Sequence, residues 1–369
     1  MGQKQAIGLG ARRAILDFLA ATTPRRYHRA VVSRIKVAVL GVGSLGQNHA
    51  RIYSDLHQQG AVELIGVYDT NAEQAGAVAE KYSTQVLGSL AEAAAADALS
   101  VVTPTTTHHH LAKPLLEQGK HLLIEKPMTD NLDEAAELVR LAKRHDCVLQ
   151  VGHIERFNPV YTYLQKAAKS PRFIESHRLS PFPARSMDIG VVLDLMIHDL
   201  DIVLAFVDSP VEHVDAAGVR VLSKSEDIAN ARLRFANGCV ANLTVSRVSP
   251  EQMRKIRVFS GGDEPSYVSL DYREQKGYYY RLAREGEQES SFLKKLLTAK
   301  DSTIVSQFGG KRVVREPVPI VQEEPLKVEL ESFVHCVKKK QAPVVTGESA
   351  RQAIELALEI TRQIQEQSD

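Results

Sequence analysis

The chain has few cysteines, almost no net charge and no long hydrophobic run. Its three cysteines, Cys147, Cys239 and Cys336, lie far apart and form no Cys-x-x-Cys pair, which argues against a disulfide scaffold or a zinc site and fits a reducing compartment. Lys and Arg number 46 and Asp and Glu 45, so no charge excess attracts nucleic acid or an anionic membrane. No apolar run approaches the roughly 20 residues of a transmembrane helix. We therefore expect a cytoplasmic protein without nucleic-acid or membrane partners.

Length and charge divide the chain into three expected parts. At 369 residues it is long for one domain, and two domains are the natural expectation. Residues 1–33 carry six Lys and Arg side chains against Asp17 alone. A targeting peptide or basic arm is one interpretation. The favoured one is a poorly ordered extension, or an over-long translation start ahead of the first strand. We expect a nucleotide-binding domain at 34–152 and a substrate and oligomerisation domain at 153–369.

Short apolar runs alternate with helical patterns in the first of these domains. The expected strands are residues 35–40, 62–68, a short one around Val86, 98–103, 121–124 and 147–151. Between them, amphipathic stripes and capping residues such as Ser89 and Asn131 mark helices. Six strands alternating with helices predict an α/β Rossmann domain, a doubly wound parallel sheet.

A glycine loop, Gly41-Val-Gly43-Ser44-Leu45-Gly46, follows the first strand and opens a helix. The first glycine permits a tight turn, the second lets the backbone approach a pyrophosphate, and the third allows close packing of helix and strand. The free N–H groups of the helix N-terminus then face the phosphates.

An acidic residue, Asp69, ends the second strand 23 residues after Gly46. This is the context that makes a glycine loop indicative of a dinucleotide. A carboxylate here accepts hydrogen bonds from the ribose hydroxyls and repels a 2′-phosphate, which favours NAD over NADP.

Later strands of the same domain bring further side chains to the carboxyl edge of the sheet, where ligands of open α/β sheets bind. Thr103, Pro104 and His108 follow one strand, and Glu125-Lys126-Pro127 follows the next. Lys126 is placed to touch both the cofactor and a substrate hydroxyl, and the proline biases it towards an extended backbone.

Three adjacent histidines, 108–110, resemble a metal tract. Neighbours on a helix point about 100° apart, so the three cannot converge on one ion. We expect no metal there and one of the three facing the cofactor edge.

The second domain shows consecutive strand-like runs without helices between them. They cover residues 214–221, 229–235, 239–248, 256–260 and 267–271. Asn237-Gly238 is a strong hairpin signal, and the pattern predicts an α+β domain with an open antiparallel sheet. Residues 275–322 are expected to be irregular, and helices at 326–339 and 349–366 to pack back on the body.

A helix expected at 190–207 carries Asp194 and His198. Spaced i and i+4, they would share one face, with the carboxylate orienting a histidine that takes a proton from an alcohol. Asp201 would extend this face to a three-ligand metal set, a less favoured interpretation. Guanidinium groups suit phosphates and carboxylates, so three arginines near the presumed cleft are candidates for substrate binding: Arg156, Arg178 and Arg185.

These motifs together resemble the Gfo/Idh/MocA family from residue 35 to the C-terminus: the glycine loop, Thr-Pro with a histidine, Glu-Lys-Pro, and Asp-x-x-x-His. The resemblance implies a Rossmann domain with an open antiparallel sheet, NAD(P), sugar or cyclitol substrates, and a homodimer or homotetramer. It also implies that Lys126, Asp194 and His198 form the catalytic set.

Two segments, 152–159 and 194–201, resemble those of family members that oxidise the 3-hydroxyl of UDP-N-acetylglucosamine. That resemblance implies a partner transaminase and a place in lipid A synthesis. A dehydrogenase of inositol or free sugars is the alternative enzyme. A non-catalytic NAD-binding sensor is less favoured, because the Lys, Asp and His are all present.

Overall fold

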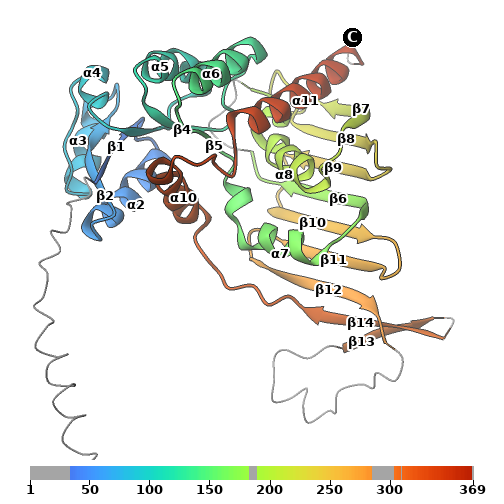
Figure 1. The fold of residues 1–369 in the computed structure, drawn as a ribbon. Helices are drawn as coiled ribbons and strands as arrows, with labels where there is room; N and C mark the ends of the chain where they lie inside the picture. The colour runs from blue at the N-terminus through green and yellow to red at the C-terminus, as the bar shows by residue number, and fades with distance from the viewer. Residues whose placement is uncertain (1–33, 183–188, 285–302, 309, 368–369) are drawn as a thin grey trace, which may run out of the picture. The chain divides into compact units, whose positions relative to one another are not determined.

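A computed structural model describes residues 34–182, 189–284, 303–308 and 310–367 of the chain. The extension expected at 1–33 and the candidate Arg185 lie outside the described residues. Two sheets organise what is described. One is a five-stranded parallel sheet, and the other has nine strands (Figure 1).

The parallel sheet has the strand order β2-β1-β3-β4-β5. Its strands are β1 (Ile35–Leu40), β2 (Val62–Tyr68), β3 (Ala98–Val101), β4 (His121–Glu125) and β5 (Leu149–Gly152). The prediction of a sixth strand around Val86 is wrong, because Val86 makes only one isolated parallel bridge, to Val67. The doubly wound arrangement is confirmed.

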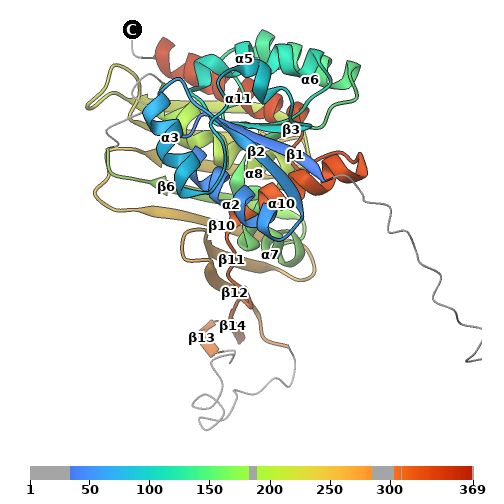
Figure 2. The same cartoon turned by 90° about the vertical axis from the view of Figure 1, so that its left-hand side faces the viewer.

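Helices cover both faces of this sheet. They are α2 (Gly46–Gln58), α3 (Ala72–Lys81), the single turn α4 (Leu90–Ala93), α5 (Thr105–Glu117) and α6 (Leu132–Arg144). Ser89 and Asn131 accept hydrogen bonds from the first helical N–H groups, as predicted. Asn71 does the same at the start of α3. Figures 1 and 2 both show α5 and α6 on one face and α2 on the other, beside the C-terminal α10 (Pro325–Lys339).

The second sheet has the order β13-β14-β12-β11-β10-β6-β9-β8-β7. Its strands are β6 (Pro171–Leu179), β7 (Val211–Val219), β8 (Ile228–Phe235), β9 (Val240–Ser246), β10 (Met253–Ser260), β11 (Ser266–Asp271), β12 (Lys276–Leu282), β13 (Thr303–Phe308) and β14 (Lys311–Pro317). Pairing is antiparallel except between β6 and β9. The hairpin at Asn237-Gly238 is confirmed, with Gly238 at φ +80°.

The expectation of an irregular stretch at 275–322 is wrong where β12, β13 and β14 lie within it. Residues 285–302 and 309 of that stretch lie outside the described residues. The charged side chains of β12 and β14 pair across the strands rather than break them. Arg281 on β12 donates to Glu316 on β14 at 2.5 Å, and cross-strand pairs of opposite charge stabilise a sheet. Strand β6 was also missed, because Glu175, His177 and Arg178 interrupt the apolar pattern by which a strand is recognised.

Helices pack on one face of the nine-stranded sheet (Figure 1). They are the 3-10 turn η1 (Ile154–Phe157), α7 (Pro159–Ala167), the π turn η2 (Val192–Met196), α8 (Ile197–Val207) and α11 (Gly347–Glu366). The C-terminal helices pack back on the body, as predicted. Leu330 and Phe333 of α10 are fully buried in the core shared with α2, and Gln363 of α11 donates to the backbone of β7.

Candidate active site

A cavity of about 1180 Å³ opens at the carboxyl edge of the parallel sheet. It takes lining residues both from the parallel-sheet loops and from the segments beside the nine-stranded sheet. Nine residues that the sequence singled out line it together: Gly41, Gly43, Ser44, Leu45, Asp69, Thr103, Pro104, Lys126 and Asp194. Ligand pockets usually measure about 300–1,000 Å³, so the space exceeds what one small ligand needs.

The glycines of the loop differ in what surrounds them. Gly41 has φ +84°, and a Cβ there would lie 2.6 Å from the carbonyl oxygen of Val102. A Cβ on Gly46 would lie 1.9 Å from the carbonyl oxygen of Gly41, so Gly46 serves packing and does not line the cavity. A Cβ on Gly43 would meet no atom within 4 Å. The open space over Gly43 is where the backbone can meet a phosphate.

The Asp69 carboxylate is fixed at the end of β2. One oxygen accepts from the backbone N–H of Val42 at 2.8 Å, and the other accepts from that of Asn71 at 2.9 Å. Gln74 in turn donates to the carbonyl of Val42 at 3.1 Å. The glycine loop and the acid that follows β2 therefore form one hydrogen-bonded unit facing the cavity.

His108 differs from expectation, because it lies behind the cavity edge. Its ring nitrogens lie 3.0 Å from the carbonyl oxygen of Pro127 and 2.8 Å from that of Thr103. Burial lowers the pKa of His108 below its ordinary value. The ring thus joins the two loops that follow β3 and β4, while His110 is the histidine of the three that lines the cavity.

Glu125 is likewise buried beside the cavity and not in its lining. Its carboxylate lies 3.1 Å from Nε2 of His49. A Cβ on Gly152 would lie 2.7 Å from that carboxylate, so a larger residue at this position of β5 would push the Glu125 side chain aside. Glu125 therefore helps to position the residue that follows it, Lys126.

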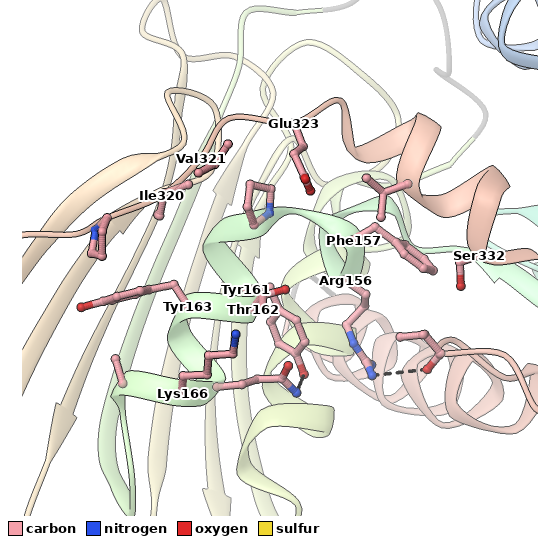
Figure 3. Close-up of a pocket in the computed structure, with 16 residues that line it drawn as sticks. Arg156, Phe157, Tyr161, Thr162, Tyr163, Lys166, Ile320, Val321, Glu323 and Ser332 are labelled. Carbon is pink, nitrogen blue, oxygen red and sulfur yellow. Dashed lines mark hydrogen bonds between the residues drawn. The ribbon is translucent and has the colours of Figure 1, made fainter. Parts of the chain in front are cut away.

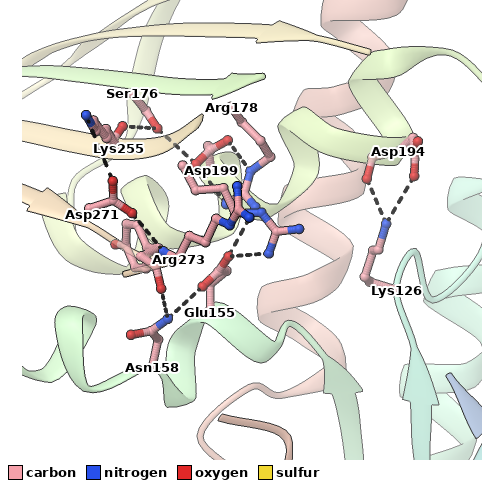
Figure 4. A network of polar contacts seen from close by, with 12 residues as sticks. Lys126, Glu155, Asn158, Ser176, Arg178, Asp194, Asp199, Lys255, Asp271 and Arg273 are labelled. Carbon is pink, nitrogen blue, oxygen red and sulfur yellow. Dashed lines mark hydrogen bonds and ion pairs between the residues drawn. The ribbon is translucent and has the colours of Figure 1, made fainter. Parts of the chain in front are cut away.

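Lys126 and Asp194 meet in the cavity. The Lys126 ammonium donates to the backbone oxygen of Asp194 at 2.7 Å and lies 3.4 Å from its Oδ1 (Figure 4). Lys126 is joined to Pro127 by a cis peptide bond. The two side chains are 19% and 17% exposed, so a mostly desolvated cation and anion face a space that can hold a substrate.

The expected contact between Asp194 and His198 is not found among the hydrogen bonds and ion pairs of the described residues. Asp194 lies in the π turn η2, whose hydrogen bonds span five residues rather than four, so the α-helical alignment is not kept. His198 lies beside His153, with ring centroids 6.2 Å apart and the rings edge to face. Burial, together with the positive charges of Lys126 and Arg178, lowers the pKa of His198 well below its ordinary value. The imidazole is therefore neutral at pH 7.

The two described candidate arginines do not line the cavity. Arg156 lies 3.4 Å from Asp201 and 5.1 Å from the centre of the Tyr161 ring, in a separate cavity of about 830 Å³ (Figure 3). Arg178 is buried, donating twice to Asp199 and once to Glu155 at 2.9–3.2 Å (Figure 4). Both arginines therefore neutralise internal carboxylates.

The arginine that does line the cavity is Arg254, which sequence reasoning missed together with His110, Ser180 and Gln252. The expected strand began at 256, whereas β10 begins at Met253. The alternation of the strand could have identified Arg254. Ile256 and Val258 are buried on the inner face, and residue 254, two positions before Ile256, lies on the same face.

Within the parts of the chain that the structure describes, no group of three or more His, Cys, Asp and Glu could hold a metal ion. Asp201, considered as a third ligand, is engaged by Arg156. In the same residues, no helix is both long and apolar enough to cross a membrane.

Known proteins resemble the chain in sequence. The family model "Oxidoreductase family, NAD-binding Rossmann fold" matches residues 35–153, and "GFO/IDH/MocA C-terminal domain" matches 169–262. The chain is 34% identical to UDP-N-acetylglucosamine 3-dehydrogenase of Acidithiobacillus ferrooxidans, over 88% of this chain and 96% of that protein. It is 25% identical to scyllo-inositol 2-dehydrogenase (NAD(+)) of Bacillus subtilis, over 89% of this chain and 93% of that protein.

Solved structures agree. A structure of the Acidithiobacillus ferrooxidans enzyme matches with a TM-score of 0.77 at 33% identity, covering 90% of this chain and 98% of that one. Levoglucosan dehydrogenase, at 15% identity and a TM-score of 0.74 over 90% of this chain and 97% of that one, shares the fold. The chain therefore belongs to the Gfo/Idh/MocA family of oxidoreductases, and its first domain is an NAD-binding Rossmann fold.

Proposed function

We propose that the protein oxidises a secondary hydroxyl of a sugar ring to a ketone with NAD, and that the substrate is UDP-N-acetylglucosamine, oxidised at its 3-hydroxyl. The observation that carries the proposal is that one cavity holds both the glycine loop and the Lys126–Asp194 pair. The relative oxidising UDP-N-acetylglucosamine, 34% identical over most of both chains, supports the choice of substrate.

The loop residues fit NAD. The space over Gly43, the start of α2 at Gly46 and the fixed carboxylate of Asp69 are suited to a pyrophosphate and an unphosphorylated ribose. When bound, NAD supplies an acceptor for the hydride of the carbinol carbon. In this proposal Ser44, Leu45, Thr103 and Pro104 complete the cofactor side of the cavity.

Three residues of the chain handle the hydroxyl proton in this scheme. Lys126 donates a hydrogen bond to the hydroxyl oxygen and stabilises negative charge that develops on it. Asp194 holds the ammonium in place. His198 does not line the cavity with Lys126 and Asp194. In this proposal its buried, neutral imidazole takes up the proton, because a general base must be unprotonated when the hydroxyl ionises.

The product would be a 3-keto nucleotide sugar. A transaminase that converts this ketone to an amine, as in diamino-sugar synthesis for lipid A, is the partner reaction that we propose. We also propose a cytoplasmic enzyme that forms a homodimer or homotetramer. The three cysteines are free thiols, which suits a reducing compartment.

NADH formation by the purified protein tests the proposal. The panel is UDP-N-acetylglucosamine, other UDP-sugars, myo-inositol and free glucose, each with NAD. We expect NADH with UDP-N-acetylglucosamine, increased when a transaminase and an amino donor remove the ketone. The inositol dehydrogenases among the relatives give the second candidate, and a signal with inositol but none with UDP-sugars would establish it. NAD binding without turnover of any sugar would favour the sensor.

A further inference from the structure

Arg254 is the arginine in the lining of the cavity, within the described part of the chain. It lies on β10 near Gln252 and Ser180, which line the same space. Its side chain is 54% exposed, so the guanidinium is available to a ligand. In the sheet register Arg254 is paired with Arg178 of β6, which places both on the inner face that carries the helices.

The carboxylates beneath Arg254 already accept hydrogen bonds from other side chains. Arg178 donates to both oxygens of Asp199 and to Oε1 of Glu155, at 2.9–3.2 Å. Asn158 donates to the other oxygen of Glu155 at 3.1 Å. Arg254 reaches the same Oε1 of Glu155 only at 3.6 Å, beyond hydrogen-bond distance. Its positive charge is thus held near the cavity while its N–H donors remain largely unused by the described residues.

A guanidinium with free donors matches the oxygens of a phosphate in a fork geometry. The dinucleotide has its own phosphate site at the glycine loop and the N-terminus of α2, on the parallel-sheet side of the cavity. Arg254 belongs to the other side, with Ser180 and Asp194. A second anionic group, in a ligand that also reaches Lys126, fits this arrangement.

We propose that Arg254 binds the diphosphate of a nucleoside diphosphate sugar and thereby selects nucleotide sugars over uncharged polyols. The inference rests on the proposed function and deepens it, because it assigns the residue that recognises the substrate class. The diphosphate of NAD is the other group that Arg254 could bind. The experiment below distinguishes the diphosphate of NAD from that of the nucleotide sugar.

Binding titrations of UDP, uridine and NAD test the assignment. We would compare the unmodified protein with Arg254→Met, Arg254→Lys and the matched control Arg257→Met. Arg257 lies on the same strand but the opposite face, 3.6 Å from Glu175, and does not line the cavity. For Arg254→Met we expect UDP binding to weaken about 10- to 100-fold, the usual loss for charged hydrogen bonds. Arg254→Lys should weaken UDP binding less than Arg254→Met does, and Arg257→Met should leave UDP binding unchanged.

Uridine and NAD should bind all four proteins equally, which also shows that each variant is folded. Equal UDP affinity in the unmodified protein and Arg254→Met would overturn the role of Arg254 while leaving the proposed function intact. A loss confined to NAD would assign the residue to the cofactor instead and overturn the inference. An equal loss for uridine and UDP would refute a diphosphate contact. If the unmodified protein binds no UDP and oxidises no UDP-sugar, the inference and the proposed substrate both fail.

Discussion

Lys126, just beyond strand β4, donates to the backbone oxygen of Asp194 at 2.7 Å and lies 3.4 Å from the carboxylate of the same residue. The contact joins the edge of the parallel sheet to the helix packed on the nine-stranded sheet. An ammonium has three N–H donors, and these contacts engage two of them. The third remains for a hydroxyl oxygen in the cavity.

The first prediction concerns that ammonium. Lys126→Met should lower kcat about 10²- to 10⁴-fold, the range for a proton-handling group, while the Kd for NAD changes little. Steady-state NADH formation and a binding titration measure the two quantities. Lys113→Met is the control, since Lys113 lies on α5 in a surface ion pair with Glu137. Turnover retained in Lys126→Met would exclude the lysine from the chemistry.

The second prediction concerns the pH dependence of kcat/KM. Burial lowers the pKa of His198 well below the ordinary 6.5, and a base acts only while unprotonated, so activity is lost as pH falls through this lowered pKa. The acidic limb should therefore lie below pH 6.5, with no loss between about pH 8 and 6.5. His198→Gln should lower the maximal kcat/KM and remove its decrease at acidic pH. His213→Gln, at an exposed position of β7, should change neither. An acidic limb that persists in His198→Gln would assign the base elsewhere.

The third prediction separates two glycines of one loop. Gly46→Ala places a Cβ 1.9 Å from the carbonyl oxygen of Gly41, so we expect a loss of about 1–3 kcal/mol in the free energy of unfolding. Gly43→Ala meets no protein atom within 4 Å, so stability should hold while NAD binding weakens about tenfold or more. Urea unfolding and NAD titration of both variants would test this. Normal NAD affinity in Gly43→Ala would place the phosphates elsewhere.

Much of the site was predictable because local signals fixed it. The glycine loop, Asp69 and Lys126 each follow a strand of a parallel sheet, and topology alone brings such residues to one edge. The relation of Asp194 to His198 was not predictable in the same way. The predicted contact assumed that both residues lie on one regular α-helix. The π turn found at Val192–Met196 depends on tertiary packing, which the local sequence does not reveal.

The errors in the fold have a physical cause as well. In the missed strands 276–282 and 311–317, the charge of Arg281 is compensated by Glu316, which lies on a different strand far along the chain. A single strand carries no sign of that partner, so its charges indicate a loop. Arg254 was missed for a related reason, because a strand boundary set three residues late hides the alternation that faces it inward.

The fourth prediction concerns the choice of cofactor. Asp69→Asn keeps the shape and, through its one amide oxygen, one of the two hydrogen bonds from Val42 and Asn71, but it removes the negative charge that repels a 2′-phosphate. The ratio of the Kd for NADP to the Kd for NAD should fall about tenfold. Glu63→Gln, elsewhere on β2, controls for the loss of one charge. An unchanged ratio would show that Asp69 does not face the ribose.

The fifth prediction concerns a buried carboxyl far along the chain. Glu329 of α10 has no exposed side-chain surface, and neither carboxyl oxygen has a hydrogen-bond partner among the described residues. Burial raises the pKa of Glu329 well above 4.5, and the nearby carboxylates of Glu125 and Asp201 raise it further. The folded protein thus holds a proton that the unfolded chain releases.

This difference in bound protons makes the free energy of unfolding depend on pH. Above about pH 4.5 the unfolded state binds fewer protons, so the free energy of unfolding decreases as pH rises, by up to about 1.4 kcal/mol for each pH unit until the folded pKa is reached. Glu329→Gln removes this cost. It should be nearly neutral at about pH 4.5 and stabilise by up to about 3 kcal/mol at pH 7. Urea unfolding at both pH values measures it, with Glu331→Gln as control, because Glu331 is an exposed residue of the same helix at the limit of a pair with Lys327. A variant destabilised equally at both pH values would mean that the Glu329 carboxyl makes a contact that the amide cannot replace.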